Sequence, residues 1–396
     1  MAFNWGLIND NVTEDDKQKM IEFIKSPNVR FTNGANVKEF EKKWSDWLGV
    51  KHSVFINSGA SANYICSAIV RDLYGKGEVI VPSLGWVSNI ASLVNLGHTP
   101  VFVDVSMKSM GASIESIREA YSEKTRAISL IHLLGFNCFN DEIRNFADSK
   151  GLMILEDCCE SHGAKYNDMK VGTLGDISCF SFYFGHHMTS VEGGMICTDD
   201  DRLYELSKLY RSHGMTRELS EESHRVYSDK NPDMNPMFTF AVPGFNFRNT
   251  EINAVLGINQ LKRLDKNIQI RTRNFNTWIE NLNPDLYFVD FDSSGSSNFA
   301  LPLILKNKNR LLFDKVCEIL KNNKVEYRIG TAGGGNQSRQ PYLTDGNYSY
   351  RIVGSLKNVN HIHSYGLYIG NHTEVSEKEV IGLCFLLNSI GGFIDD

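Results

Sequence analysis

Between residues 52 and 200, short apolar segments alternate with stretches that carry the spacing of amphipathic helices. The apolar segments are HSVFI, EVIVP, PVFVDV, RAISLIHL, LMILED and ISCFSF. Most gaps between them are long enough for a helix, and parallel strands need crossover connections of that kind. The pattern therefore predicts an α/β fold in which helices cover a mostly parallel sheet.

The chain beyond residue 250 predicts a second, smaller unit. The segment TEINAVLGINQLKRLDKNIQIRTRNFNTWIENL has the pattern of one long helix or two. An apolar strand around FALPLIL, a helix over LLFDKVCEILKNN, a strand at VEYRI and a helix over SEKEVIGLCFLLNSI follow. We expect residues 1–255 to form a large domain with an N-terminal arm, and residues 256–396 to hold a linking helix and a small α+β domain.

Charge and composition exclude several classes of partner. The formal net charge is -6, the chain has no basic block, and no apolar run approaches the roughly 18 residues of a membrane helix. We therefore expect no nucleic-acid or membrane partner, and the start MAFNWGLINDNVTEDD, which lacks a signal-peptide pattern, predicts a cytoplasmic protein. The eight cysteines include no CxxC pair, which favours buried thiols over disulfides or a metal site.

Two motifs in the first half have the composition of a cofactor site. INSGASAN places Ser58, Gly59 and Ala60 between a predicted strand and a predicted helix, where backbone N–H groups and the helix dipole bind phosphate. An ordinary turn with a serine cap is the alternative. VPSLGW ends the next strand near Trp86, whose ring could stack on a flat cofactor or simply be a core or surface residue.

Two further motifs follow the later strands of the predicted sheet. ILEDCCESHGA ends a strand in Glu156 and Asp157, and ligands collect at the carboxyl ends of strands in open α/β sheets. A helix-capping aspartate is the alternative. ISCFSFYFGHHMTSVEGGMICTDD, residues 177 to 200, then joins two apolar runs through a loop that has no lysine. His186 stands five residues after Ser181 and six before Glu192, and His187 follows it.

In this order, the motifs resemble the DegT/DnrJ/EryC1/StrS family of nucleotide-sugar aminotransferases over nearly the full chain. That resemblance implies fold type I of the pyridoxal-phosphate (PLP) enzymes, with a large, mostly parallel sheet domain and a smaller C-terminal α+β domain. In most of the family a lysine bound to the cofactor occupies the position of His186. The resemblance extends to a branch that has the same His-His pair and removes the 3-hydroxyl of a sugar.

The resemblance also implies roles for individual residues. Asp157 would contact the pyridinium nitrogen, Trp86 would stack on the ring, Glu160 would lie near the ring hydroxyl or a water, and Ser58, Gly59, Ala60 and Ser181 would bind the phosphate. GFNFRNTEINAVLG matches a segment whose asparagine, here Asn246, reaches the phosphate across a dimer interface, which predicts a homodimer with shared active sites. Candidates for binding the sugar nucleotide or a glutamate carboxylate are His187, His213, Arg217, Arg248 and Arg328.

The exchange of lysine for histidine predicts the chemistry. Lysine both tethers PLP and moves protons, whereas imidazole forms no stable imine but is a neutral base near pH 7. We therefore expect PLP and its pyridoxamine form (PMP) to bind non-covalently, with His186 as the base. The expected reaction removes the C3 hydroxyl of a nucleotide-linked 4-keto-6-deoxy sugar, either GDP-4-keto-6-deoxy-mannose or a heptose analogue. Glutamate would donate the amine and ammonia would be released, in dideoxysugar synthesis for lipopolysaccharide or capsule.

Three alternatives remain open at this stage. The chain could be an ordinary aminotransferase that uses Lys165 or Lys170, although both lie outside the expected frame. It could be an iron-sulfur 3-dehydratase for CDP sugars, although the resembling enzyme has clustered cysteines and those here are scattered. It could also be a catalytically silent homologue that binds a sugar nucleotide or a partner, against which the retained Asp157, Ser181, Trp86 and Glu192 argue.

Overall fold

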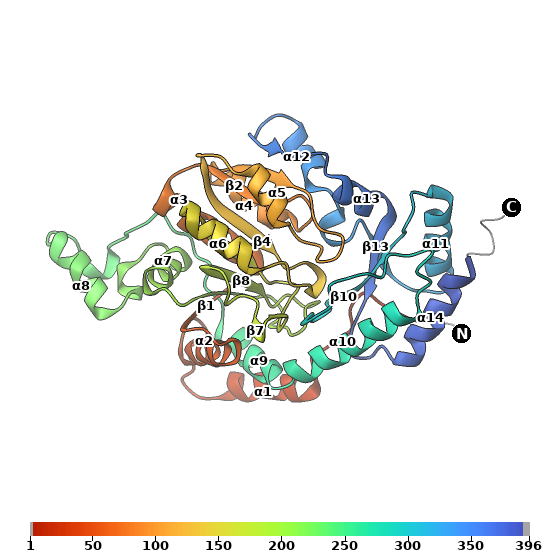
Figure 1. Ribbon diagram of the computed structural model, residues 1–396. Helices are drawn as coiled ribbons and strands as arrows, with labels where there is room; N and C mark the ends of the chain where they lie inside the picture. The colour runs from red at the N-terminus through yellow and green to blue at the C-terminus, as the bar shows by residue number, and fades with distance from the viewer. Residues whose placement is uncertain (1–2, 391–396) are drawn as a thin grey trace.

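The computed structural model describes residues 3–390 and is built around one large twisted sheet (Figure 1). Strand β9 runs antiparallel to its neighbours β1 and β8, and every other neighbouring pair in this sheet is parallel. The prediction of a mostly parallel α/β sheet is therefore confirmed. The strands, in sheet order, are β1 (His52–Ile56), β9 (Gly194–Thr198), β8 (Ile177–Ser181), β5 (Met153–Asp157), β4 (Thr125–Ile131), β2 (Glu78–Pro82), β3 (Thr99–Val103) and β12 (Arg351–Ile352).

Helices cover both faces of this sheet because its side chains alternate between two cores. Val54 and Ile56 of β1 pack into one core with Ile65, whereas Phe55 packs into the other against Phe40, with 4.9 Å between the ring centroids. The first face is covered by α3 (Gly59–Tyr74), α4 (Val87–Asn95) and α7 (Asp201–Arg211). The second is covered by α2 (Ala35–Leu48), α5 (Ile114–Ala120), α6 (Asp141–Lys150) and α9 (Glu251–Leu261), with α1 (Glu14–Lys25) packed on α9.

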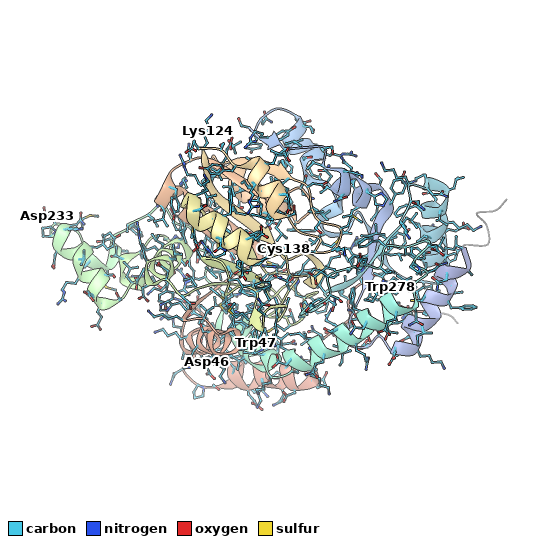
Figure 2. The ribbon with its side chains drawn as sticks, in the orientation of Figure 1. Asp46, Trp47, Lys124, Cys138, Asp233 and Trp278 are labelled. Carbon is cyan, nitrogen blue, oxygen red and sulfur yellow. The ribbon has the colours of Figure 1, made fainter. Side chains whose placement is uncertain are left out.

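A second sheet organises the C-terminal part of the chain. Its three antiparallel strands are β10 (Ala300–Ile304), β13 (Gly366–Gly370) and β11 (Tyr327–Ile329). Around it lie α10 (Leu264–Asn281), α11 (Arg310–Asn322), α12 (Pro341–Thr344), α13 (Lys357–Tyr365) and α14 (Glu377–Asn388). Trp278 of α10, labelled in Figure 2, is fully buried and donates its indole N–H to the Pro302 carbonyl oxygen at 2.8 Å. The predicted helical segment after residue 250 is thus two helices, α9 and α10.

Strand pairing crosses the predicted domain division at residue 255 in both directions. Near the N-terminus, Trp5 forms a parallel bridge with Val325, and its indole N–H donates to the Gly370 carbonyl at 2.7 Å. In the other direction, β12 extends the large sheet beside β3. The division into residues 1–255 and 256–396 stays a prediction.

The segment that contains α8 (Glu221–Lys230) projects from one end of the protein (Figure 1). None of the residues of α8, all of which the structure describes, is buried. Apolar side chains are exposed along and beyond this helix, namely those of Val226, Met234, Met237, Phe238, Phe240 and Phe245. Large apolar side chains exposed together in one segment of the chain are typical of an interface with another protein.

The remaining elements are short. They are the hairpin strands β6 (Lys165–Tyr166) and β7 (Met169–Lys170) and the single-turn 3₁₀ helices η1 (Leu133–Gly135), η2 (Thr216–Glu218), η3 (Pro236–Phe238), η4 (Ala332–Gly334) and η5 (Gln337–Arg339). Among residues 3–390, no helix combines the length and apolar character needed to cross a membrane.

Candidate active site

A cavity of about 830 Å³ lies at the carboxyl ends of the strands of the large sheet. Its walls include the starts of α3 and α4 and the ends of β5 and β8, together with Phe299 and Tyr368 from the second sheet and its approach. The predicted residues that line it are Ser58, Gly59, Ala60, Trp86, Asp157, Glu160, Ser181, His186, Glu192 and Arg328. The fold therefore brings together motifs that are separated by up to 270 residues in the sequence.

The start of α3 has the geometry of a phosphate site. Ser58 caps the helix, because its Oγ accepts a hydrogen bond from the Ser61 N–H at 3.1 Å. The backbone N–H groups of Gly59 and Ala60 have no partner within the helix, since they belong to its first turn. A Cβ on Gly59 would lie 2.7 Å from the Ser181 Cβ and 2.9 Å from the Cys159 Sγ. Only glycine lets this turn approach Ser181 so closely. The Ser58 cap is present, and phosphate binding at this helix start stays a prediction.

Asp157 is held by three hydrogen bonds at the floor of the cavity. Its Oδ2 accepts from the side-chain amides of Asn63 at 2.9 Å and Asn89 at 2.5 Å. Its Oδ1 accepts from the Cys159 N–H at 2.9 Å. These bonds fix the plane of the carboxylate, which is only 6% exposed. A fixed carboxylate is what the nitrogen of a protonated heterocycle requires as a partner.

Glu160 lies beside Asp157 in the cavity wall. Its Oε2 accepts a hydrogen bond from the Leu134 N–H at 2.9 Å. Burial, together with the nearby Asp157 carboxylate, raises the pKa of Glu160 to about 7. Near neutral pH this side chain is therefore divided between a protonated form that can donate a hydrogen bond and an ionised form that cannot.

His186 faces the cavity from a turn rather than from an extended segment. Its backbone N–H donates to the Tyr183 carbonyl at 3.0 Å, and its ring is half-buried beside Phe299, with 5.3 Å between ring centroids. Burial lowers the pKa of His186 to about 4, although the Asp157 carboxylate acts in the opposite direction. The imidazole is therefore neutral at physiological pH and can accept a proton.

No lysine lines this cavity within residues 3–390. Lys165 and Lys170 lie in the β6–β7 hairpin. Lys170 donates to the Trp47 backbone carbonyl and lies over the Trp47 ring, 4.7 Å from its centroid. Neither lysine is placed to act at His186 or Asp157, which removes the structural basis for an aminotransferase that uses one of them.

A model of the DegT/DnrJ/EryC1/StrS aminotransferase family matches residues 10–385. The chain belongs to this family. A GDP-4-keto-6-deoxy-D-mannose 3-dehydratase of Yersinia pseudotuberculosis is 32% identical over 374 residues, which cover 92% of this chain and 94% of that protein. A GDP-perosamine synthase of Caulobacter vibrioides, one of the family's aminotransferases, is 36% identical over 241 residues, which cover 61% of this chain and 60% of that protein.

Solved structures of the DegT/DnrJ/EryC1/StrS family have the same fold. A GDP-4-keto-6-deoxymannose-3-dehydratase with a trapped PLP-glutamate geminal diamine matches with a TM-score of 0.86 and 28% identity, and the match covers 97% of this chain and 100% of that one. The prediction of fold type I is confirmed.

His187 does not face the cavity as its neighbour His186 does. Its side chain is fully buried, and its Nε2 lies 3.1 Å from the Ser297 carbonyl oxygen. It does not line the cavity. The expectation of a direct contact between His187 and a sugar is therefore wrong for this arrangement.

Four other predicted residues lie outside the cavity of their own chain. The Asn246 Oδ1 accepts from the Arg248 N–H at 3.3 Å, and the His213 N–H donates to the Phe245 carbonyl at 2.8 Å. Arg217 donates to the Met237 carbonyl at 3.3 Å. None of the four lines the cavity described here. Their predicted roles in binding the cofactor or the sugar nucleotide therefore stay predictions.

Several residues of the site are not predicted by the sequence motifs. Asn63 and Asn89 orient Asp157, and Tyr183, Phe299, Glu326 and Tyr368 complete the walls. For the two asparagines a signal existed. Each is a polar residue on a buried helix face that is otherwise made of apolar residues and one serine, and buried amides of this kind need a polar partner.

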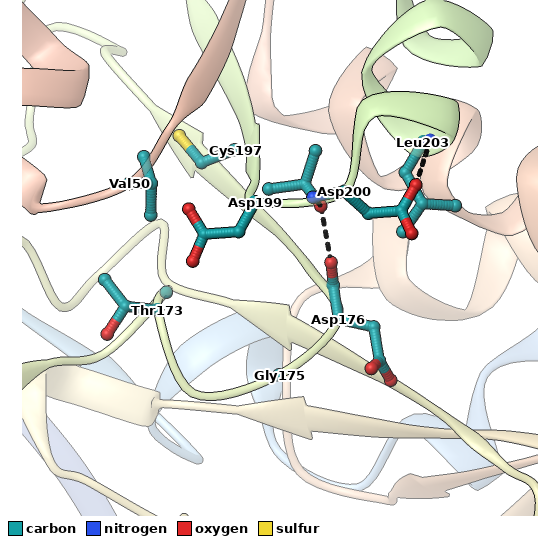
Figure 3. A pocket seen from close by; sticks show the side chains of 10 residues that line it. Val50, Thr173, Gly175, Asp176, Cys197, Asp199, Asp200 and Leu203 are labelled. Carbon is teal, nitrogen blue, oxygen red and sulfur yellow. Dashed lines mark hydrogen bonds between the residues drawn. The ribbon is translucent and has the colours of Figure 1, made fainter.

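A smaller cavity of about 200 Å³ lies beside the start of β8 and the end of β9 (Figure 3). Three aspartates border it, and each already has a backbone partner. Asp176 accepts from the Ile154 N–H at 2.6 Å, Asp199 from Lys51 at 2.6 Å, and Asp200 from Leu203 at 2.9 Å as the cap of α7. The carboxylates thus stabilise turns and a helix start.

Cysteine sulfurs near the floor of the cavity do not favour an iron-sulfur enzyme. The Cys159 and Cys179 sulfurs and an Asp157 oxygen lie within 4.8 Å of one another. The hydrogen bond between the two cysteines, together with burial, raises the pKa of Cys159 well above its ordinary value. Clusters are typically held by four cysteine thiolates, and Cys159 is the one cysteine among the described residues that lines this cavity.

Proposed function

We propose that this protein is a PLP-dependent 3-dehydratase of a nucleotide-linked 4-keto-6-deoxy sugar. The observation that carries the proposal is the neutral imidazole of His186 on the cavity wall, in the position where aminotransferases of the family have lysine. Such a site keeps a base for moving protons and has no amine for tethering the cofactor.

The residues present fit PLP and PMP. The start of α3 and Ser181 would hold the phosphate, Asp157 would pair with the pyridinium nitrogen, and Trp86, which is 57% exposed at the cavity, would cover the ring. Glu160 would face the ring hydroxyl. When bound, the cofactor would supply an electron sink conjugated to the sugar carbonyl carbon.

His186 would act as both base and acid. Because its Nδ1 is buried, its Nε2 is the nitrogen that faces the cavity, and we assign the accepted proton to that atom. The imidazolium so formed can return the proton to the departing C3 hydroxyl as the C3–O bond breaks. Glutamate would be oxidised to 2-oxoglutarate with release of ammonia, and the oxygen lost from the sugar balances the oxygen gained by glutamate.

We propose GDP-4-keto-6-deoxy-mannose, or a heptose analogue, as the substrate and L-glutamate as the amino donor. The dehydratase relative supports the sugar, and the trapped glutamate adduct of the matched structure supports the donor. Arg328 and Glu326 lie on the wall contributed by the second sheet and its approach, where a carboxylate or phosphate would find a cation in Arg328. The dideoxysugar product would serve surface polysaccharide synthesis.

A nucleotide-sugar aminotransferase is the second candidate, and the perosamine synthase relative favours it. The two reactions leave different products, because transamination replaces the keto oxygen by an amine whereas dehydration removes the C3 oxygen. The lack of a lysine on the cavity wall of residues 3–390 favours dehydration.

We further propose a homodimer in which each cavity receives Asn246 from the other subunit. Asn246 does not line the cavity of its own chain. It follows directly on the exposed apolar side chains of residues 226–245, a surface that a second copy would cover.

Mass spectrometry of products tests the proposal. The protein is incubated with PLP, glutamate and 4-keto-6-deoxy sugars linked to GDP, CDP, dTDP or UDP, with the protein omitted as control. We expect one GDP-sugar to give a product lighter by one oxygen, together with ammonia. A 4-amino sugar as the main product would instead establish the aminotransferase, and no product from any sugar would support the silent homologue.

A further inference from the structure

Behind His186 lies a buried group of imidazoles that the proposed reaction does not use. The ring centroid of His162 is 6.1 Å from that of His186 and 5.3 Å from that of His187. His162 is fully buried against Trp44 and Phe182, with centroid distances of 5.5 and 5.6 Å. His162 thus lies between an aromatic core and the proposed base.

The ring nitrogens of this group are unusually poor in partners. Four ring nitrogens make no hydrogen bond to the described residues: both nitrogens of His162, Nδ1 of His186 and Nδ1 of His187. The backbone of Ser181 lies close enough to His162 to favour its charged form, yet without hydrogen-bond geometry. A buried polar atom without a hydrogen-bond partner destabilises the fold, so four such atoms in one place call for a common partner.

No charged side chain serves as the partner of these nitrogens. Burial lowers the pKa of His162 well below its ordinary value, and His186 and the Arg271 guanidinium act in the same direction. Arg271 is itself buried and donates to the carbonyls of Phe299, at 2.9 Å, and Asn371. A cation beside the group keeps all three imidazoles neutral, and each neutral ring has one donor and one acceptor nitrogen.

We propose that His162 is a positioning residue for His186: through one internal water it binds the Nδ1–H of His186 and so directs the lone pair of Nε2 into the cavity. A water can bridge two polar atoms up to about 5.5 Å apart at ordinary hydrogen-bond lengths. The two ring centroids are 6.1 Å apart, and nitrogens that face each other across the gap lie closer together than the centroids. The water would find the two to four polar partners that internal waters need.

The proposed water would give His186 a hydrogen-bond partner on Nδ1, which fixes its tautomer. A catalytic imidazole is usually fixed in one tautomer by a partner on its second nitrogen, and no described side chain or carbonyl serves His186 Nδ1 directly. Without His162, the proton of His186 would distribute between Nδ1 and Nε2. Every molecule with the proton on Nε2 would be unable to accept a proton from the cavity.

Neutron diffraction from crystals of the PLP-bound protein tests the proton position without any variant. We expect deuterium on Nδ1 of His186, none on Nε2, and a water between His186 and His162. Deuterium on Nε2, or rings that contact no common water, would overturn the proposal. The proposal rests on His186 as the base of the proposed function, but this measurement does not depend on which sugar, if any, is turned over.

Two substitutions at His162 separate positioning from packing. We expect His162→Phe to lower kcat about tenfold to a hundredfold with little change in the KM of the sugar, whereas His162→Gln, whose amide can bind the same water, stays within about threefold of the parent. His98→Phe, a buried imidazole outside the cavity, controls for the loss of a buried histidine. Equal losses in both His162 variants would mean that the residue only packs, and would contradict the proposal.

Discussion

The Asp157 carboxylate and the Asn89 amide form a close hydrogen bond, with 2.5 Å between Oδ2 and Nδ2. The same oxygen accepts from Asn63 at 2.9 Å. Both asparagines come from helices, α3 and α4, that start at the cavity. The orientation of the carboxylate proposed for the pyridinium nitrogen is thus set by two helix starts that also form the walls of the site.

Replacing Asn89 by leucine should weaken PLP binding about tenfold. The substitution removes a donor from a buried carboxylate oxygen, a loss of about 1–3 kcal/mol, while Asn63 keeps part of the orientation. The dissociation constant is measured by titrating the protein with PLP and following its absorbance. Asn89→Asp sets a second carboxylate against Asp157 and should weaken binding further. Parental affinity in both variants would show that Asp157 does not depend on this partner.

The positions of the main site residues follow from sequence, because strand ends set them. Gly59, Asp157 and Ser181 each come at or just after the end of an apolar run, and the carboxyl ends of parallel strands share one edge of a sheet. Asn63 and Asn89 could not be assigned in the same way. Each lies on a helix, and its bond to Asp157 spans 94 or 68 residues, so its partner depends on how the helices pack.

The sequence predicts the direction of β9, but it does not predict the presence of β12. The twelve residues 182–193 between β8 and β9 form no helix and only just reach the length of a crossover between parallel strands, so this connection favours an antiparallel β9. Strand β12 has only the two residues Arg351 and Ile352. Two residues have no periodicity, and this strand exists because β3 offers an open edge.

The free energy of unfolding should fall as the pH is lowered from about 6.5 toward 4, with part of the fall due to His186. Its pKa is about 4 in the folded chain and near 6.5 when unfolded. Within that range the unfolded chain binds the extra proton, so stability is lost as pH falls. In His186→Asn the unfolding free energy should depend less steeply on pH, by an amount that corresponds to the uptake of up to about one proton on unfolding. Urea unfolding at several pH values measures this, and equal slopes would contradict the burial of a neutral imidazole.

Glu160 should make PLP binding weaken as the pH rises through about 7. Its raised pKa means that the protonated carboxyl, which can donate to a ring oxygen, is lost in that range, and a second negative charge forms beside Asp157. Glu160→Gln keeps a donor at every pH and should lack this part of the dependence. The dissociation constant of PLP is measured for both proteins from pH 6 to 8. Taking the ratio of the two constants cancels the effect of PLP's own titration. If the PLP affinities of the parent and Glu160→Gln differ by the same factor at every pH in this range, the proton of Glu160 has no role in binding.

Mixing two inactive variants should restore activity if the sites are shared. In a hybrid of Asn246→Ala and His186→Asn subunits, one cavity has both an intact His186 and an intact Asn246 from its partner. Random pairing makes half of the dimers hybrids with one intact site each, so about a quarter of the parental activity should return. A mixture of His186→Asn with His186→Lys subunits should restore none. Hybrid dimers that form but stay inactive would contradict shared sites, as would an active monomer.

His186→Lys should bind PLP covalently and lose dehydration. A lysine side chain in this position reaches the cavity that His186 faces, and its amine can bond to the PLP aldehyde, so borohydride should fix cofactor to this residue in the variant and to no lysine in the parent. Dehydration should fall by about 10²–10⁴, the usual contribution of a general base, because the amine is bonded or, with an ordinary pKa near 10.4, protonated. His186→Asn should lose as much activity while binding PMP through residues that do not change. Product release is followed by mass spectrometry in all three proteins. If His186→Asn still forms the 3-deoxy sugar at a rate close to the parent, another group accepts the proton, and Glu160, a carboxyl group beside Asp157 in the cavity wall, becomes the residue to replace next.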